Sequence, residues 1–374
     1  MTNLPKLMVI GAGISGLSTA IILQELGFQV EIISKHHPFK SDMDPAFASL
    51  FPSASVIPHS VYSPSATNLF KESQRRFKYL YQSGFPGIGI NRHFELYTTP
   101  KPLPAYADLM ENFSPWEKLH SGWHPAHPKY GIHTGWSFNC YFADWKIYFP
   151  ALFNYFKEAG GILTIKELTP KTLSQLQTDI LINCSELGAL QLFNDPKRLV
   201  YQGHLIKVFD APLLIDPNGH RVSYNFTPPR ERYQNKHGNA LDVYCYPRTD
   251  GWILGGSRYK GIVDRELTFK GEMPSPPTVH LNGTDFPAQI MSMNDEIIQS
   301  SFGITLSEFP QKKGLVGYRY VRDEQNGLRL ESEIKDSKLI IHNYGHGGAG
   351  VTLSWGCAQK VAKLIAEKTK LEYP

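Results

Sequence analysis

The first 34 residues contain the feature that most constrains the fold of this chain: two apolar runs joined by a glycine-rich turn and a helical segment. Residues 7–10 are continuously apolar, as in a strand that is covered on both faces of a parallel sheet. The next residues read Gly11-Ala12-Gly13-Ile14-Ser15-Gly16, and a helical run over 17–26 ends at Gly27. Residues 28–33 read as a second strand. A strand, a GxGxxG turn, a helix and a strand in this order predict an α/β unit that binds a dinucleotide.

Each glycine of this turn has its own task. Gly11 permits the tight turn, Gly13 lets a pyrophosphate approach the backbone, and Gly16 lets the helix pack closely on the strand. The helix N-terminus offers N–H groups and partial positive charge to the phosphates. Ser34 and Lys35 stand where an acidic residue usually binds a ribose hydroxyl. A hydroxyl can still bond there and a lysine tolerates a phosphate, so these residues leave the identity of the dinucleotide open.

A second glycine-rich turn lies near the C-terminus. Residues 339–344 read as a strand, and four glycines follow within the six residues 345–350. An amphipathic helix is expected over 351–365, because its apolar residues recur at spacings of three and four. Bare backbone amides just before a helix suit an anionic or electron-rich ligand group.

The C-terminal segment resembles the signature of the D-amino-acid oxidase family of flavoproteins. The resemblance runs through Tyr344-Gly-His-Gly-Gly-x-Gly and the following Trp355-Gly356-Cys357-Ala358. Weaker resemblances follow the family's order over nearly the whole chain, among them residues 179–185, 254–256 and 317–322. The resemblance implies two domains, non-covalent FAD and both ends of the chain meeting at one flavin.

The resemblance also implies which residues form the site. Arg319 and Tyr244 would hold a substrate carboxylate, and the backbone carbonyl of Gly348 would accept a hydrogen bond from the substrate amine. Arg319 would also border the flavin. Further residues implied at the cofactor, beside the N-terminal turn, Ser34 and Lys35, are Ala48, Ser49, Leu50, Cys184, Ser185, His346, Gly347, Gly348, Ala349, Gly350, Val351 and Thr352.

The chain departs from the family pattern at three places. Ala240 stands where a second pocket tyrosine is expected, four residues before Tyr244. Glu186 stands where the family usually has glycine, and its carboxylate would either face solvent or alter the site. The segment 86–129, rich in Pro, Trp and His, does not align with the family and is expected to shape the substrate entrance.

The fold expected from the resemblance is α/β: a Rossmann-type FAD-binding domain with an inserted, mainly antiparallel β substrate domain. The FAD-binding domain is expected to be discontinuous, over 1–60, 145–200 and 315–374, with the substrate domain over 61–144 and 201–314. A helix is expected to have Pro150 in its first turn, since proline suits that position. Strands are expected over 205–209, 241–246 and 252–256. The proline-rich run 269–285 reads as a long surface loop.

The function that follows is an FAD-dependent oxidase that removes hydride from the α-carbon of an amino acid. The resemblance favours the D-enantiomer, with an imino acid hydrolysing to a keto acid and ammonia, and with oxygen reduced to hydrogen peroxide. Two alternatives stay open because of the departures: an oxidase or dehydrogenase of glycine, N-substituted amino acids or another amine, and a flavin-bound binding module without turnover.

The composition of the chain limits which kinds of partner it can bind and where in the cell it is expected. The net charge of +4, from 38 basic and 34 acidic residues without a basic run, argues against nucleic acid. The four cysteines form no CxxC pair and the histidines no HExxH motif, so neither a disulfide framework nor a metal site is expected. No apolar stretch reaches the roughly 20 residues that span a membrane. The protein is expected to be cytoplasmic, and to be a monomer or a homodimer.

Overall fold

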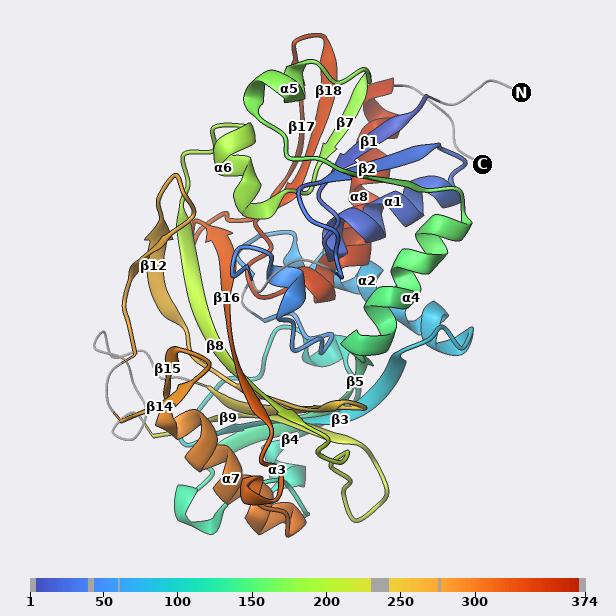
Figure 1. Cartoon of the computed structure of the whole chain (residues 1–374). Coiled ribbons are helices and arrows are strands. Elements are labelled where there is room, and N and C mark those ends of the chain that lie inside the picture. Colours follow the sequence, from blue (N-terminus) through green and yellow to red (C-terminus); the bar gives the residue numbers. More distant parts are fainter. Residues whose placement is uncertain (1–4, 40–43, 60, 230–241, 275–276, 370–374) are drawn as a thin grey trace.

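The structure is a computed structural model, and it describes residues 5–39, 44–59, 61–229, 242–274 and 277–369. Figure 1 shows one sheet with its helices in the upper part of the view and a larger sheet below it. Two long neighbouring strands, β8 (Leu199–Phe209) and β16 (Lys312–Arg322), run between the two parts, and they pair antiparallel. The α/β class expected from the sequence is confirmed.

Among the described residues, six strands form the upper sheet. All its neighbours pair parallel except β17 and β18, which pair antiparallel. β1 is buried at every position, as its apolar run predicts. The order across the sheet is β17 (Arg329–Lys335), β18 (Lys338–Tyr344), β7 (Ile180–Asn183), β1 (Leu7–Ile10), β2 (Val30–Ser34) and β6 (Ile162–Ile165).

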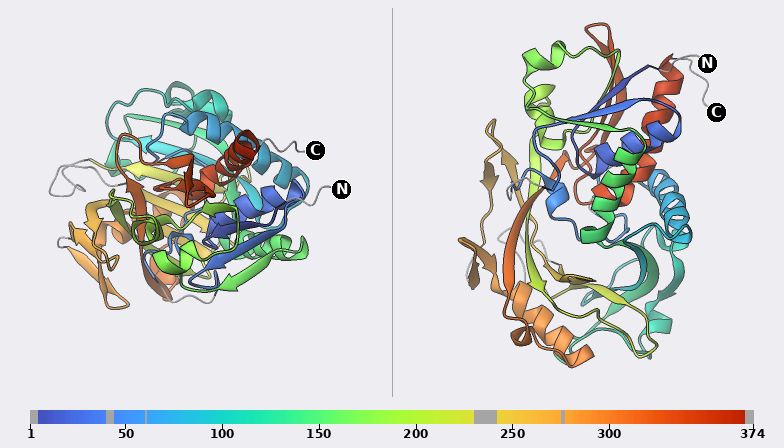
Figure 2. Two further views of the ribbon diagram at one scale, coloured as in Figure 1. Left: turned by 90° about the horizontal axis from the view of Figure 1, so that it is seen from above. Right: turned by 45° about the vertical axis from the view of Figure 1, so that its right-hand side comes forward.

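Helices cover the upper sheet (Figure 2). α1 (Ile14–Glu25) is buried from Ile14 to Leu23 and contacts both α8 (Gly350–Thr369) and α4 (Trp145–Glu158). α2 (Ala66–Gln82) also packs on α8, where the Gly356 N–H donates to Ser73 Oγ at 2.8 Å. The domain boundaries expected from the resemblance stay a prediction. α2, which packs on α8, falls in the segment assigned there to the substrate domain.

The lower sheet has ten strands among the described residues. Its neighbours pair antiparallel except β3 and β9, which pair parallel. β16 pairs with β8 beside the main order of strands. That order is β13 (Phe269–Gly271), β12 (Tyr259–Val263), β8, β11 (Gly251–Gly255), β10 (Val243–Arg248), β9 (Val222–Thr227), β3 (Ile88–Tyr97), β5 (Thr134–Ala143) and β4 (Glu111–Pro115).

A long helix and several short elements complete the chain. α7 (Ala288–Phe302) packs Ile290, Met293 and Ile297 into the core of the lower sheet and ends at Gly303, whose φ is 70°. The short elements are α3 (Trp116–Leu119), α5 (Pro170–Ser174), α6 (Ala189–Leu192), η1 (Ala48–Leu50), η2 (Ala107–Leu109), η3 (Pro128–Tyr130), η4 (Glu186–Gly188) and η5 (Leu306–Glu308).

Two local expectations are wrong. Pro150 lies inside α4, which begins five residues earlier at Trp145, because Trp145, Tyr148 and Phe149 are buried and extend the apolar face toward the N-terminus. The run 269–285 is not one loop. It contains β13 and most of a hairpin formed by β14 (Thr278–Leu281) and β15 (Thr284–Pro287), in which Phe286 is buried against α7.

Candidate active site

The carboxyl ends of three parallel strands meet at one edge of the upper sheet and open into one long pocket. Gly11 directly follows β1, Cys184 follows β7 and Gly345 follows β18, so both glycine-rich turns lie at this edge. The pocket continues from there to Tyr244 and Arg319 on the lower sheet. The implied residues that line it are Gly11, Ala12, Gly13, Ile14, Ser15, Ser34, Lys35, Ala48, Ser49, Cys184, Ser185, Tyr244, Arg319, His346, Gly347, Gly348, Gly350 and Val351.

Four implied residues do not line the pocket. Gly16 packs α1 on β1, since a Cβ there would lie 1.9 Å from the Gly11 carbonyl oxygen. Leu50 packs among the apolar residues around Phe51, and Ala349 is fully buried in the core. The Thr352 hydroxyl donates to the Ile57 carbonyl oxygen at 2.9 Å. These residues shape the walls behind the pocket.

The N-terminal turn is held by close backbone contacts. Gly11 has a φ of 102°, and a Cβ there would lie 2.5 Å from the Cys184 carbonyl oxygen. A Cβ on Gly13 would lie 2.9 Å from Ser49 Oγ, which accepts the Ile14 N–H at 3.0 Å. α1 has no side-chain cap at its N-terminus, so the helix end is open toward the pocket for an anionic group.

The carboxyl ends of β2 and β6 lie side by side at the pocket. Ser34 Oγ donates to the His36 carbonyl oxygen at 2.9 Å, and Lys35 pairs with Glu167 at 2.7 Å. Residues 166–168 also line the pocket, and they were not predicted as site residues. The signal that could have identified them is the parallel pairing of β6 beside β2, which brings the two strand ends together.

Arg319 and Tyr244 form the far end of the pocket. Arg319 Nη1 donates to the Ser257 carbonyl oxygen at 3.1 Å. Two bare glycines make room for these side chains: a Cβ on Gly203 would lie 2.1 Å from Arg319 Nη1, and one on Gly256 would lie 2.5 Å from the Tyr244 hydroxyl. Burial lowers the pKa of Arg319 and raises the pKa of Tyr244. A guanidinium stays charged despite such a shift, so this end can bind a carboxylate.

The C-terminal turn presents its backbone to the middle of the pocket. Gly345 and Gly347 have φ values of 85° and 58°, which only glycine adopts without strain. The Gly347 N–H donates to the Tyr320 carbonyl oxygen at 3.0 Å, and α8 begins at Gly350. The turn is thereby tied to β16, the strand that carries Arg319.

Glu186 does not face solvent. Its carboxylate accepts the Gly345 N–H at 3.0 Å and contacts His346 Nδ1 at 2.5 Å, and both side chains line the pocket. The departure from the family pattern therefore changes the site at the glycine-rich turn. Of the other two departures, Ala240 lies outside the described residues, and the segment 86–129 contributes no residue to the lining of this pocket.

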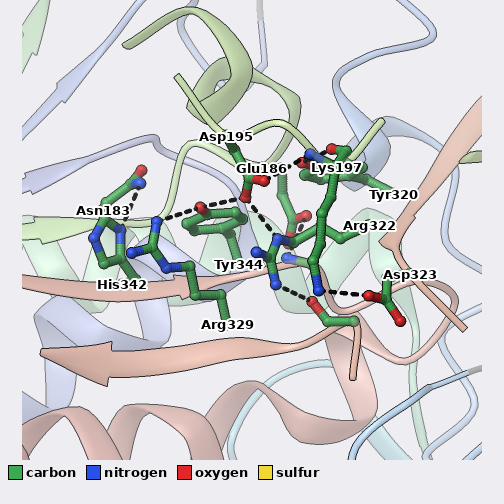
Figure 3. Close-up of polar contacts among 12 residues, drawn as sticks. Asn183, Glu186, Asp195, Lys197, Tyr320, Arg322, Asp323, Arg329, His342 and Tyr344 are labelled. Atoms are coloured by element: carbon green, nitrogen blue, oxygen red, sulfur yellow. Dashed lines mark hydrogen bonds and ion pairs between the residues drawn. The ribbon is translucent and has the colours of Figure 1, made fainter. Parts of the chain in front are cut away.

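A buried polar network behind the turn was not identified from the sequence (Figure 3). The Asp195 carboxylate accepts from Arg322 Nε and from the Tyr344 hydroxyl, both at 2.6 Å. Arg322 Nη1 also donates to the Gly327 carbonyl oxygen at 2.8 Å. Burial opposes the charge of Asp195, but the bonds from Arg322 and Tyr344 outweigh it and hold its pKa below the usual value. The network ties β16 to β18 close to the pocket.

Comparison with known proteins gives the class. Residues 6–364 match the family DAO, described as FAD dependent oxidoreductase, and the chain belongs to this family. It is similar to a D-amino-acid oxidase of Rubrobacter xylanophilus, with 26% identity over 364 residues, 96% of this chain and 95% of that protein. A D-aspartate oxidase of Homo sapiens is 25% identical over 375 residues, 97% and 95% of the two chains.

A solved structure shares the fold. A glycine oxidase from Bacillus cereus covers 99% of this chain and 96% of its own, with a TM-score of 0.56 at 14% identity. The chain is thus an FAD-dependent oxidoreductase, as the sequence resemblance implied. No helix within the described ranges combines the length and apolar character needed to cross a membrane.

The residues present fit FAD. The same pocket is lined by Ser34 and Lys35, by both glycine-rich turns and by Arg319, so one extended ligand could contact all of them. The close approaches at Gly11 and Gly13 leave bare backbone on the pocket side. FAD, when bound, supplies an acceptor for a hydride from a C–H bond.

Proposed function

We propose that this chain is an oxidase of D-amino acids. The α-C–H bond of the substrate breaks, its hydride passes to FAD, and the nitrogen loses a proton to give an imino acid. Water then converts the imino acid to a keto acid and ammonia, and oxygen takes the two electrons to become hydrogen peroxide. The observation that carries the proposal is that Arg319 and Tyr244 stand together at the end of a pocket that begins at the N-terminal GxGxxG turn.

The chain's own residues bind and orient the substrate. The planar Arg319 guanidinium can hold a carboxylate by two parallel hydrogen bonds, and the Tyr244 hydroxyl adds a third donor. Gly348 lines the same pocket, and its carbonyl would accept from the amine and so favour the neutral form of the amine. If residues 345–350 hold the isoalloxazine ring, these groups would fix the α-carbon of the substrate beside it. Holding the reacting atoms in place lowers the activation free energy by several kcal/mol; in well-oriented intramolecular reactions the lowering reaches roughly 7–11 kcal/mol.

The amino-acid substrate is preferred over an amine because of where Glu186 lies. Its carboxylate is bonded to Gly345 and His346 at the glycine-rich turn, and it is not directed at Arg319 and Tyr244. An amine without a carboxylate would leave the guanidinium of Arg319 without a counter-charge in a largely buried position, which is unfavourable.

We further propose oxygen as the electron acceptor and the cytoplasm as the location. The relatives of this chain named above include proteins called oxidases, and the four cysteines are free and buried, as is usual where thiols stay reduced.

The test is anaerobic mixing of the purified yellow protein with D-alanine, D-aspartate, L-alanine, glycine and sarcosine. We expect D-amino acids to bleach the flavin absorbance, and admission of oxygen to restore it with formation of peroxide. Bleaching only by glycine or sarcosine would favour an oxidase of those amines. No bleaching by any compound would favour a binding module.

The Arg319→Leu variant tests the substrate end. We expect it to raise the KM for the D-amino acid by at least about 30-fold, since a hydrogen bond to a charged group contributes about 1.5–3 kcal/mol. FAD content should stay unchanged. Arg75→Leu, which removes an exposed arginine of α2, is the matched control. Equal loss of FAD and substrate binding would show that Arg319 is structural.

A further inference from the structure

Glu186 links two loops that are far apart in the sequence. It begins η4, directly after β7, and its carboxylate reaches the turn that follows β18. One oxygen accepts the Gly345 N–H and the other meets His346 Nδ1, whose ring is 1% exposed. Figure 3 shows Glu186 beside the buried network of Asp195 and Arg322. A glycine, the usual family residue here, has no group that could make these contacts.

The hydrogen bonds around His346 fix the protons on its ring. The Thr19 hydroxyl donates to the Ser15 carbonyl oxygen at 2.6 Å, and it has one hydrogen to give. The Thr19 oxygen therefore accepts from Asn343 Nδ2, 3.1 Å away, and Asn343 Oδ1 turns toward His346 Nε2 at 3.0 Å. Because Oδ1 only accepts, Nε2 carries a hydrogen. On the other side, the proton shared with Glu186 resides on the stronger base, the imidazole, so Nδ1 carries a hydrogen too.

Electrostatics agree with this assignment. Burial opposes the charged imidazole, but the Glu186 carboxylate and the Cys357 thiol outweigh it and raise the pKa of His346 to about 10. Among the groups that raise the pKa of His346, the Glu186 carboxylate has the largest effect. The other titratable or charged groups near the pair are Cys184 on the loop after β7, Tyr320 and Arg322 on β16, and Asp195 after α6. Burial raises the pKa of Cys184 and Tyr320, which keeps both neutral, and Arg322 and Asp195 neutralise each other.

We propose that Glu186 is a positioning residue that holds His346 as a doubly protonated imidazolium beside the FAD ring, so that the charge at the turn 345–350 does not change with pH near neutrality. The proposal rests on the proposed placement of the isoalloxazine along residues 345–350. His346 lies next to the N-termini of α1 and α8, which already carry partial positive charge: its Nδ1 is 3.4 Å from Ser15 Oγ, and a Cβ on Gly350 would lie 3.9 Å from the His346 Cβ. A second positive group there needs a counter-charge, and Glu186 supplies it.

The test uses the FAD-bound protein with 15N-labelled histidine. The resonances missing from His346→Gln identify the ring of His346. We expect the native protein to keep imidazolium shifts from about pH 6 to about pH 9. In Glu186→Gln the ring remains buried without its carboxylate, so we expect the midpoint of its titration to fall by about 3 pH units.

The midpoint potential of the bound FAD, measured by dithionite titration over the same pH range, gives the second readout. We expect one uniform slope for the native protein and for Glu158→Gln, a control that removes an exposed carboxylate of α4. The Glu186→Gln plot should gain a bend where His346 loses its proton. If that variant does not fold, Glu186→Gly suits the φ of 48° at this position and removes the same carboxylate.

Two results would overturn the proposal: unchanged His346 shifts in Glu186→Gln, or a shifted titration of His346 without a bend in the potential. Neither readout needs an amino-acid substrate. Failure of the D-amino acids to reduce the flavin would therefore contradict the proposed function alone.

Discussion

Replacing Asp195 by asparagine tests the buried network that ties β16 to β18. The change leaves the Arg322 guanidinium, whose side chain is 9% exposed, without its counter-charge. Breaking a buried ion pair by removing one partner costs about 3–5 kcal/mol. We expect the lower end, about 3 kcal/mol, because the Gly327 carbonyl still accepts from Arg322 and an asparagine oxygen can still accept from Tyr344. Urea unfolding of the FAD-bound protein, followed by circular dichroism and flavin fluorescence, measures the loss.

The matched control is Glu331→Gln, which removes a carboxylate that is 59% exposed and paired with Arg329. Exposed pairs of this kind contribute about 0–1 kcal/mol, so this variant should unfold close to the native midpoint. If Asp195→Asn loses no more stability than the control, the network does not hold the two strands together and the reasoning fails.

The pH dependence of the same variant has a definite sign. The pKa of Asp195 is lower in the folded protein than in the unfolded chain, where it is about 3.9. The stability that this carboxylate contributes is therefore complete above about pH 4 and is lost as the pH falls through the folded value. The gap between the native protein and Asp195→Asn should be constant near neutral pH and should narrow below about pH 4. A gap that widens on acidification would contradict the assignment.

Three further changes test the walls of the pocket. Gly203→Ala places a methyl group 2.1 Å from Arg319 Nη1 and should raise the substrate KM about tenfold at unchanged FAD absorbance, where equal loss of both would refute a local effect. Gly16→Ala, with its methyl group 1.9 Å from the Gly11 carbonyl oxygen, should yield protein without flavin colour, and a normally coloured protein would contradict the packing argument. The four buried thiols should resist a thiol reagent at pH 8 until urea is added. Burial raises the pKa of Cys140, Cys184 and Cys245, and the thiol form reacts slowly. Rapid reaction of the folded protein would show that the thiols are accessible.

The parts of the site that could be predicted have local signals. Glycines that must leave room for a phosphate or adopt a positive φ cannot be replaced freely, so the turns at 11–16 and 345–350 are visible in the sequence. Buried parallel strands can be recognised in the sequence as continuous apolar runs. Because β1, β7 and β18 are neighbours and parallel, their carboxyl ends meet, and both turns reach one pocket.

Local rules failed where the packing of a distant segment decides the outcome. Proline is favoured in a first helical turn, but α4 extends five residues before Pro150 because its aromatic residues there are covered by the core. The prolines of 269–285 suggested a loop, but β14 and β15 are stabilised by contacts with α7, and β14 also contacts β16. Helix and strand propensities predict local structure poorly where a segment distant in the sequence buries the side chains in question.

Buried charges were the least predictable part of the site, and Glu186 shows why. A non-glycine residue at a φ of 48° carries a backbone cost of about 1–2 kcal/mol, which explains a glycine at this position in the family pattern. The sequence could show the departure but not what offsets it, because His346 lies 160 residues further along the chain. A bond to a charged group contributes about 1.5–3 kcal/mol, and Glu186 makes two, to the Gly345 N–H and to His346. The contacts are therefore sufficient to retain a glutamate in a conformation that glycine adopts more easily.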